Sequence, residues 1–173
     1  MRVPTYKLKL IRCGWIPYSR IDMKHPQLAA FLFHRLIGQA AVEHSAAIFL
    51  DPVGHIIGAS IISIGDLASV PMVGREVFKS SILANAGSVI VSHNHPAPSS
   101  SEPSSQDIRV TRQLIRAGEI VGVHVLDHII VTPSDKDFTS MREAEPTLCW
   151  PGIGEQRTVK QEPSGEESTS GSA

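Results

Sequence analysis

Two histidines separated by one residue, His93 and His95, end an apolar stretch, and Asp107 follows them in the run SHNHPAPSSSEPSSQD. If a strand continues through both histidines, their rings point to the same side, because side chains alternate along a strand. A helix that begins at Ser104 would turn Asp107 toward the side of that serine. Two imidazoles and one carboxylate suit zinc and leave a fourth position for water, as in catalytic zinc sites. The spacing therefore predicts a site for one Zn²⁺ ion.

The same residues also have a purely structural explanation. An aspartate such as Asp107 in the first turn of a helix complements the helix dipole, and a serine such as Ser104 is a common N-cap. Histidines in loops often only form hydrogen bonds. The metal interpretation gains support from the junction between a strand and a helix, which is where ligand sites of α/β sheets usually lie. On spacing alone, both interpretations stay open.

The elements that would position these residues follow a regular order. Apolar periodicity and the positions of Gly and Pro predict helices over 27–41, 74–87 and 104–118, and strands over 44–51, 55–65, 88–93 and 122–132. The turn signature DPVG joins the first two strands into a hairpin. The order helix, strand, strand, helix, strand, helix, strand indicates a single layered domain of the α/β or α+β class.

Composition limits the class of protein. A chain of 173 residues with 42% hydrophobic content can bury one core, and a net charge of −1 does not support binding to DNA. Cys13 and Cys149 form no CxxC pair, which favours a reducing, cytoplasmic setting. No apolar run is long enough for a bilayer, and no signal peptide is evident, so we expect no membrane partner.

We expect three segments along the chain. Residues 1–26 are rich in Pro and Gly breakers and should be irregular, residues 27–146 should form the domain, and residues 147–173 should be a disordered tail. The tail is rich in Pro, Gly, Ser and Glu and has almost no large apolar side chains, so it cannot offset the entropy of the chain by burial.

Several linked motifs resemble the RadC-like branch of the JAB/MPN (JAMM) metalloprotease family. The matching pieces lie within residues 27–142 and are GREVFKSSILANAGSVIVSHNHP, the sequence PSSQD at a helix start, and VLDHIIV. The resemblance implies a mixed sheet flanked by helices, as in JAB/MPN and cytidine-deaminase-like folds. It also implies a zinc-dependent peptidase or isopeptidase that acts on a peptide or protein substrate.

The resemblance implies a role for each site residue. His93, His95 and Asp107 would be the zinc ligands, Ser104 would stabilise the oxyanion, and Glu43 would be the general base that precedes the first strand. Asp127 and His128, adjacent on the last strand, would support the ligands from behind or would form a satisfied polar pair. The sequence leaves open which of these two explanations holds for Asp127 and His128.

The chain departs from the family pattern in one loop. Where RadC-like proteins usually read His-Pro-Ser-Gly, this chain reads HPAP, and the stretch between His95 and Ser104 is one residue longer than the seven of the core motif. The second proline stiffens the loop, and contacts to substrate are the feature that it affects most. The alternative function is a non-catalytic RadC-like module, associated with DNA repair or with protein interaction. A zinc deaminase is excluded because the chain has no PCxxC ligands.

Overall fold

The computed structural model describes residues 2–18, 25–65, 72–96 and 100–151. Its helices are α1 (Pro26–Phe33), the π-helix η1 (His34–Gly38), α2 (Gly74–Leu83), α3 (Ser105–Val121), α4 (Met141–Ala144) and the 3-10 helix η2 (Pro146–Leu148). Its strands are β1 (His44–Leu50), β2 (Ile56–Ile64), β3 (Ser88–Asn94), β4 (His124–Val131) and β5 (Phe138–Ser140). The predicted order of elements is confirmed as far as β4.

The five strands form one mixed sheet in the order β2-β1-β3-β4-β5. Strands β3 and β4 are parallel and are connected by α3, and the other neighbouring pairs are antiparallel. The carboxyl ends of β3 and β4 and the amino end of β1 therefore lie at one edge of the sheet. This edge is where ligands bind in open sheets of this kind.

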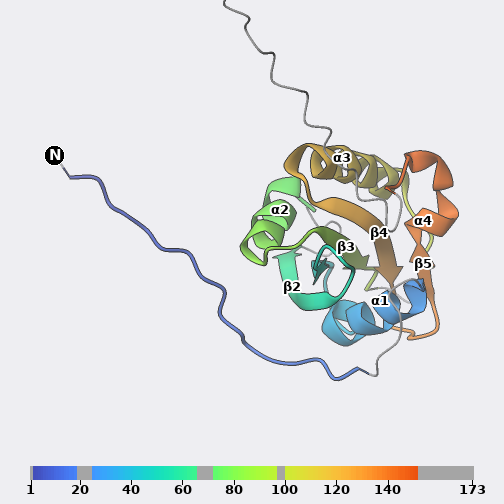
Figure 1. Ribbon diagram of the computed structural model, residues 1–173. Coiled ribbons are helices and arrows are strands. Elements are labelled where there is room, and N and C mark those ends of the chain that lie inside the picture. The colour runs from blue at the N-terminus through green and yellow to red at the C-terminus, as the bar shows by residue number, and fades with distance from the viewer. Residues whose placement is uncertain (1, 19–24, 66–71, 97–99, 152–173) are drawn as a thin grey trace, which may run out of the picture.

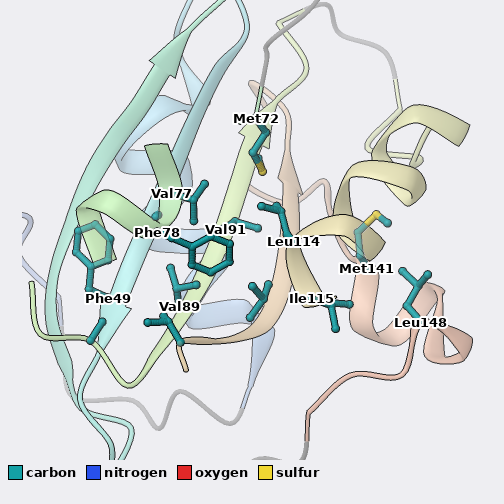
Figure 2. Close-up of a cluster of buried hydrophobic side chains, with 14 of the residues drawn as sticks. Phe49, Met72, Val77, Phe78, Val89, Val91, Leu114, Ile115, Met141 and Leu148 are labelled. Atoms are coloured by element: carbon teal, nitrogen blue, oxygen red, sulfur yellow. The ribbon is translucent and has the colours of Figure 1, made fainter. Parts of the chain in front are cut away.

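Helices cover both faces of the sheet (Figure 1). Odd-numbered residues of β1 and β3, such as Ala47 and Val91, join a core with α2 and α3. Figure 2 shows Phe78, Leu114 and Ile115 gathered over this face. The even-numbered residues join a second core with α1 on the other face. Because β1 is buried on both faces, it reads as a nearly continuous apolar run from Ala46 to Leu50, and β3 is apolar from Val89 to Val91.

Several expected boundaries were wrong. The third helix was predicted to end at Gly118, but α3 continues to Val121. Its C-cap, Gly122, has a φ of 79°, the left-handed conformation that favours glycine. A Cβ at residue 118 would lie 2.5 Å from the carbonyl oxygen of Val123, so this glycine allows the chain to pass close to the helix. The first helix becomes a π-helix at His34, and α2 ends at Leu83.

The ends of the chain differ from the domain between them. Residues 2–18 contain no helix or strand and run away from the domain (Figure 1). At the other end, β5, α4 and η2 were not expected, and the packed chain continues past the expected boundary, since Leu148 is buried and Trp150 packs against the core. Residues 152–173, most of the expected tail, lie outside the described residues. Among the helices that the structure describes, none is long and apolar enough to cross a membrane.

Candidate metal centre

His93, His95 and Asp107 meet at the carboxyl end of β3. The Nε2 atom of His93 lies 3.1 Å from Nε2 of His95 and 3.3 Å from Oδ1 of Asp107. One potential ligand atom from each residue lies within 4.8 Å of the others. Ligand atoms placed about 2.0–2.1 Å from a tetrahedral zinc ion lie about 3.3 Å apart. The donor set and its spacing therefore fit a single divalent cation.

The alternation of side chains along β3 explains why His93 and His95 lie on the same face of the sheet. Strand β3 continues through Asn94, so residues 93 and 95 project to the same face, that of α2 and α3. The backbone N–H of His95 donates to the carbonyl of Val131 at 2.9 Å, which extends the parallel pairing with β4 by one residue. The Nδ1 atom of the His95 ring lies 3.0 Å from the carbonyl oxygen of Ser100. Since a carbonyl only accepts, Nδ1 carries the proton and Nε2 is left with its lone pair.

Asp107 is oriented by a capping box at the start of α3. Its Oδ2 atom accepts hydrogen bonds from the backbone N–H of Ser104 at 2.8 Å and from the Ser104 hydroxyl at 2.5 Å. The N–H of Asp107 donates to the Ser104 hydroxyl oxygen at 3.2 Å. These bonds use one carboxylate oxygen, and the other oxygen, Oδ1, faces His93.

Burial keeps the His93 imidazole neutral. His93 is 5% exposed, and desolvation lowers its pKa to about 4, although the Asp107 charge acts in the opposite direction. For Asp107, burial raises the pKa, but the charge of His93 and the hydrogen bonds from Ser104 outweigh it, and the pKa lies below its ordinary value. At neutral pH the pair is therefore imidazole and carboxylate, which are the protonation states that bind a metal ion.

Glu43 lies directly before β1, at the same edge of the sheet. Ser45 pairs with His93 across the antiparallel β1–β3 ladder, and continuing that register by two residues sets position 43 opposite His95. Glu43 is half-buried and is not one of the three clustered ligands. Its backbone carbonyl accepts from Gly65 at 2.8 Å. The register therefore places position 43 at the same end of the sheet as the three clustered residues.

Asn94, between the two histidines, holds the chain on either side of Glu43. Its side chain points to the opposite face of the sheet and is fully buried. Its Oδ1 accepts from the N–H of His44 at 2.7 Å, and its Nδ2 donates to the carbonyls of Ala40 and Val42, each at 3.3 Å. Asn94 was not singled out from the sequence, although an amide between two candidate metal ligands is a signal that could have drawn attention to it.

The structure separates the two neighbours Asp127 and His128. His128 is 1% exposed, and its Nε2 lies 2.8 Å from Nδ1 of His93. Asp127 instead accepts hydrogen bonds from the hydroxyl of Ser140 and from the backbone N–H of Arg142, away from the cluster. Of these two residues, only His128 contacts a candidate ligand, His93. Thr111, which sequence reasoning missed, contacts the far side of the His128 ring at 2.6 Å.

The loop between the ligands is described only in part. Residues 97–99, which include the alanine and the second proline of the HPAP departure, lie outside the described residues. The loop is fixed again at Ser101, whose hydroxyl donates to Oδ1 of Asp137, just before β5, at 2.8 Å. The three candidate ligands lie close together with the longer loop between His95 and Ser104 in the chain.

Comparisons with known proteins identify a matching family and related proteins. A family model described as a RadC-like JAB domain matches residues 23–146. A UPF0758 protein of Finegoldia magna is 43% identical over 122 residues, which cover 70% of this chain and 53% of that protein. A UPF0758 protein of Desulforamulus reducens is 44% identical over 124 residues, which cover 72% of this chain and 53% of that protein. The chain spans about half the length of these curated relatives.

Proposed function

This chain belongs to the RadC-like JAB family, and from that premise we propose that it is a zinc-dependent hydrolase that cleaves an amide or isopeptide bond in a peptide or protein substrate. The observation that carries the proposal is the convergence of His93 Nε2, His95 Nε2 and Asp107 Oδ1, with separations of 3.1 and 3.3 Å from the first atom to the other two. Those distances suit zinc, and three protein ligands leave one position open.

A bound zinc ion would supply a Lewis acid and would lower the pKa of a coordinated water from about 15.7 toward about 7. Glu43 would accept the proton of the attacking water on its carboxylate and return it to the leaving amine. Its place opposite His95 in the β1–β3 register, with Asn94 holding the residues on both sides, supports this role. Glu43 is half-buried and is not one of the three clustered residues, so its carboxylate is free of the ligand role in this proposal.

Ser104 would have two tasks that compete for one proton. Its hydroxyl now donates to Asp107 Oδ2, and stabilising an oxyanion requires the same hydrogen. Turning that hydrogen toward substrate would leave the backbone N–H of Ser104 as a remaining donor to Asp107. Asp107 would then be held by this backbone donor alone while the hydroxyl serves the reaction.

The test is a Glu43→Gln variant, which removes the base and keeps the shape of the side chain. Glu119→Gln, an exposed change near the far end of α3, is the matched control. Each protein is loaded with zinc, its metal content is measured, and it is assayed against a quenched fluorescent peptide library and an isopeptide-linked substrate. We expect Glu43→Gln to retain zinc and to lose at least 100-fold in kcat, since general-base catalysis contributes about 10²–10⁴-fold.

Two results would count against the proposal in different ways. Hydrolysis by Glu43→Gln at the rate of the control would remove Glu43 from the mechanism. A folded wild-type protein that takes up no zinc would overturn the metallohydrolase proposal itself and would favour the non-catalytic module.

A further inference from the structure

A chain of short contacts leads from one ligand, through the sheet, to the backbone of another. Nδ1 of His93 lies 2.8 Å from Nε2 of His128, and Nδ1 of His128 lies 2.6 Å from the hydroxyl oxygen of Thr111. That hydroxyl also lies 2.6 Å from the backbone carbonyl of Asp107. His93, His128 and Thr111 come from β3, β4 and α3, so the chain connects three elements. All three side chains are buried.

The carbonyl of Asp107, at the end of this series of contacts, determines which atom donates in each of the hydrogen bonds. The carbonyl of Asp107 can only accept, so the hydroxyl of Thr111 must use its single hydrogen to donate there. The same oxygen must then accept from His128, which places a hydrogen on Nδ1 of that ring. A neutral imidazole has one N–H, so Nε2 of His128 is an acceptor and Nδ1 of His93 must donate to it.

The consequence appears at the cluster. With its hydrogen on Nδ1, His93 presents a bare lone pair at Nε2, the atom that lies 3.1 Å from His95 and 3.3 Å from Asp107. The carbonyl of Ser100 imposes the same tautomer on His95. Three acceptors then converge with no hydrogen between them, an arrangement that repels itself unless a cation occupies the centre.

We infer that His128 and Thr111 are positioning residues that fix the tautomer and the ring orientation of His93 for metal binding. Metal-ligating histidines usually donate their other N–H to a carboxylate, a carbonyl or water, and losing such a partner costs about 10–100-fold in metal affinity. Here the partner is a second, neutral imidazole whose own tautomer is set by a threonine. The inference rests on the proposed metal site and deepens it.

The test compares Thr111→Val, which removes the hydroxyl at nearly constant volume, with Thr111→Ser, which keeps it. Ser140→Ala is the control for losing a buried hydroxyl elsewhere, because Ser140 bonds Asp127 and not the ligands. Zinc affinity is measured by competition with a chromogenic chelator. The tautomers of His93 and His95 are read in the metal-free proteins from ¹⁵N–¹H NMR spectra of the ring nitrogens. Circular dichroism checks that each variant is folded.

We expect Thr111→Val to bind zinc about 10–100-fold more weakly and Thr111→Ser to recover most of that loss. Ser140→Ala should bind zinc like the wild type. The metal-free wild type should show His93 protonated on Nδ1. Equal zinc affinity in folded Thr111→Val, or a wild-type His93 protonated on Nε2, would overturn the inference. If Thr111→Val does not fold, the wild-type tautomer decides. A wild type without zinc affinity is instead a failure of the proposed function.

Discussion

Two aspartates, Asp107 and Asp127, lie on neighbouring elements, and their environments differ in one decisive respect. Asp107 accepts both of its side-chain bonds from Ser104 on Oδ2, and Oδ1 is left facing His93. Asp127 uses both oxygens within the fold: Oδ1 accepts from the N–H of His128 and of Arg142, and Oδ2 accepts from a hydroxyl. The comparison shows that hydrogen bonds to one carboxylate oxygen can orient the group so that the other oxygen faces the candidate metal site.

The electrostatics of the two carboxyl groups differ as well. Burial raises the pKa of Asp127, and the bonds from Ser140, Arg142 and His128 recover only part of that shift. Burial also acts to raise the pKa of Asp107, but the nearby His93 and Ser104 bring it below the ordinary value. Asp127 is therefore a structural group that is costly to keep charged, whereas Asp107 is held in the charged form that a metal ion requires.

The largest expected effect is on metal binding by Asp107→Asn. The amide removes the negative charge and one of two acceptor oxygens, so we expect zinc affinity to fall by at least about 100-fold, more than the loss of an outer partner would cause. Stability of the metal-free protein should fall only modestly, because the favourable charge is lost but Ser104 can still cap α3. Isothermal titration with Zn²⁺ and urea denaturation measure the two quantities. Zinc affinity within about tenfold of the wild type would place Asp107 outside the ligand set.

Asp127→Asn should give the opposite result. The change replaces an acceptor oxygen by an NH₂ group that must face either two backbone N–H groups or a hydroxyl. We expect the free energy of unfolding to fall by about 1–3 kcal/mol, the cost of unsatisfied buried polar groups, while zinc affinity stays within about threefold. The same urea and titration experiments compare it with Asp107→Asn. If Asp127→Asn instead lost zinc without losing stability, the distinction between the two aspartates would fail.

Local rules explain why Asp107 and the histidines could be predicted from the sequence. Alternation along β3 sets His93 and His95 on one side, and the spacing between Ser104 and Asp107 is the spacing of a capping box. Each rule involves residues within three positions of one another. The main helices and strands followed from periodicity for the same reason.

The partners of these residues could not be predicted, because they depend on pairing between distant segments. His128 reaches His93 only through the parallel register of β3 and β4, which contains an irregularity between Val89 and Ile90. That irregularity changes which residues of β4 face α3, and nothing local in VLDHIIV signals it. The sequence therefore could not distinguish the role of Asp127 from that of His128. The short strand β5, which pairs with β4, was missed for a similar reason.

A smaller effect is expected when the bonds that aim Asp107 are removed by Ser104→Ala. Loss of the N-cap should reduce the free energy of unfolding by about 1 kcal/mol. Freeing Oδ2 from the hydroxyl should also weaken zinc binding by about tenfold, because the carboxylate is then less well oriented. Ser104→Thr, which keeps the cap, is the control. Unfolding by urea and zinc titration report both effects, and unchanged zinc affinity in folded Ser104→Ala would show that the capping box does not orient the ligand.

The finest distinction between the two aspartates is in how the stability of the metal-free protein depends on pH. The folded pKa of His93 is about 4, below the ordinary 6.5, so the unfolded chain binds a proton first as the pH falls. Stability should therefore decrease from about pH 6.5 toward pH 4, by at most about 1.4 kcal/mol per pH unit for this group.

The two carboxyl groups modify that decrease with opposite signs. The folded pKa of Asp127 is raised, so the folded protein takes up this proton before the unfolded chain does, and the uptake offsets part of the loss as the pH falls toward 4. The pKa of Asp107 is lowered, so its stabilisation is lost only as the pH falls below about 3.8. Asp127→Asn should thus steepen the fall in urea midpoint above about pH 4, and Asp107→Asn should flatten the fall below about pH 4. Parallel pH profiles for the two variants would mean that their carboxyl groups titrate alike, and the contrast drawn from their hydrogen bonds would then have no electrostatic counterpart.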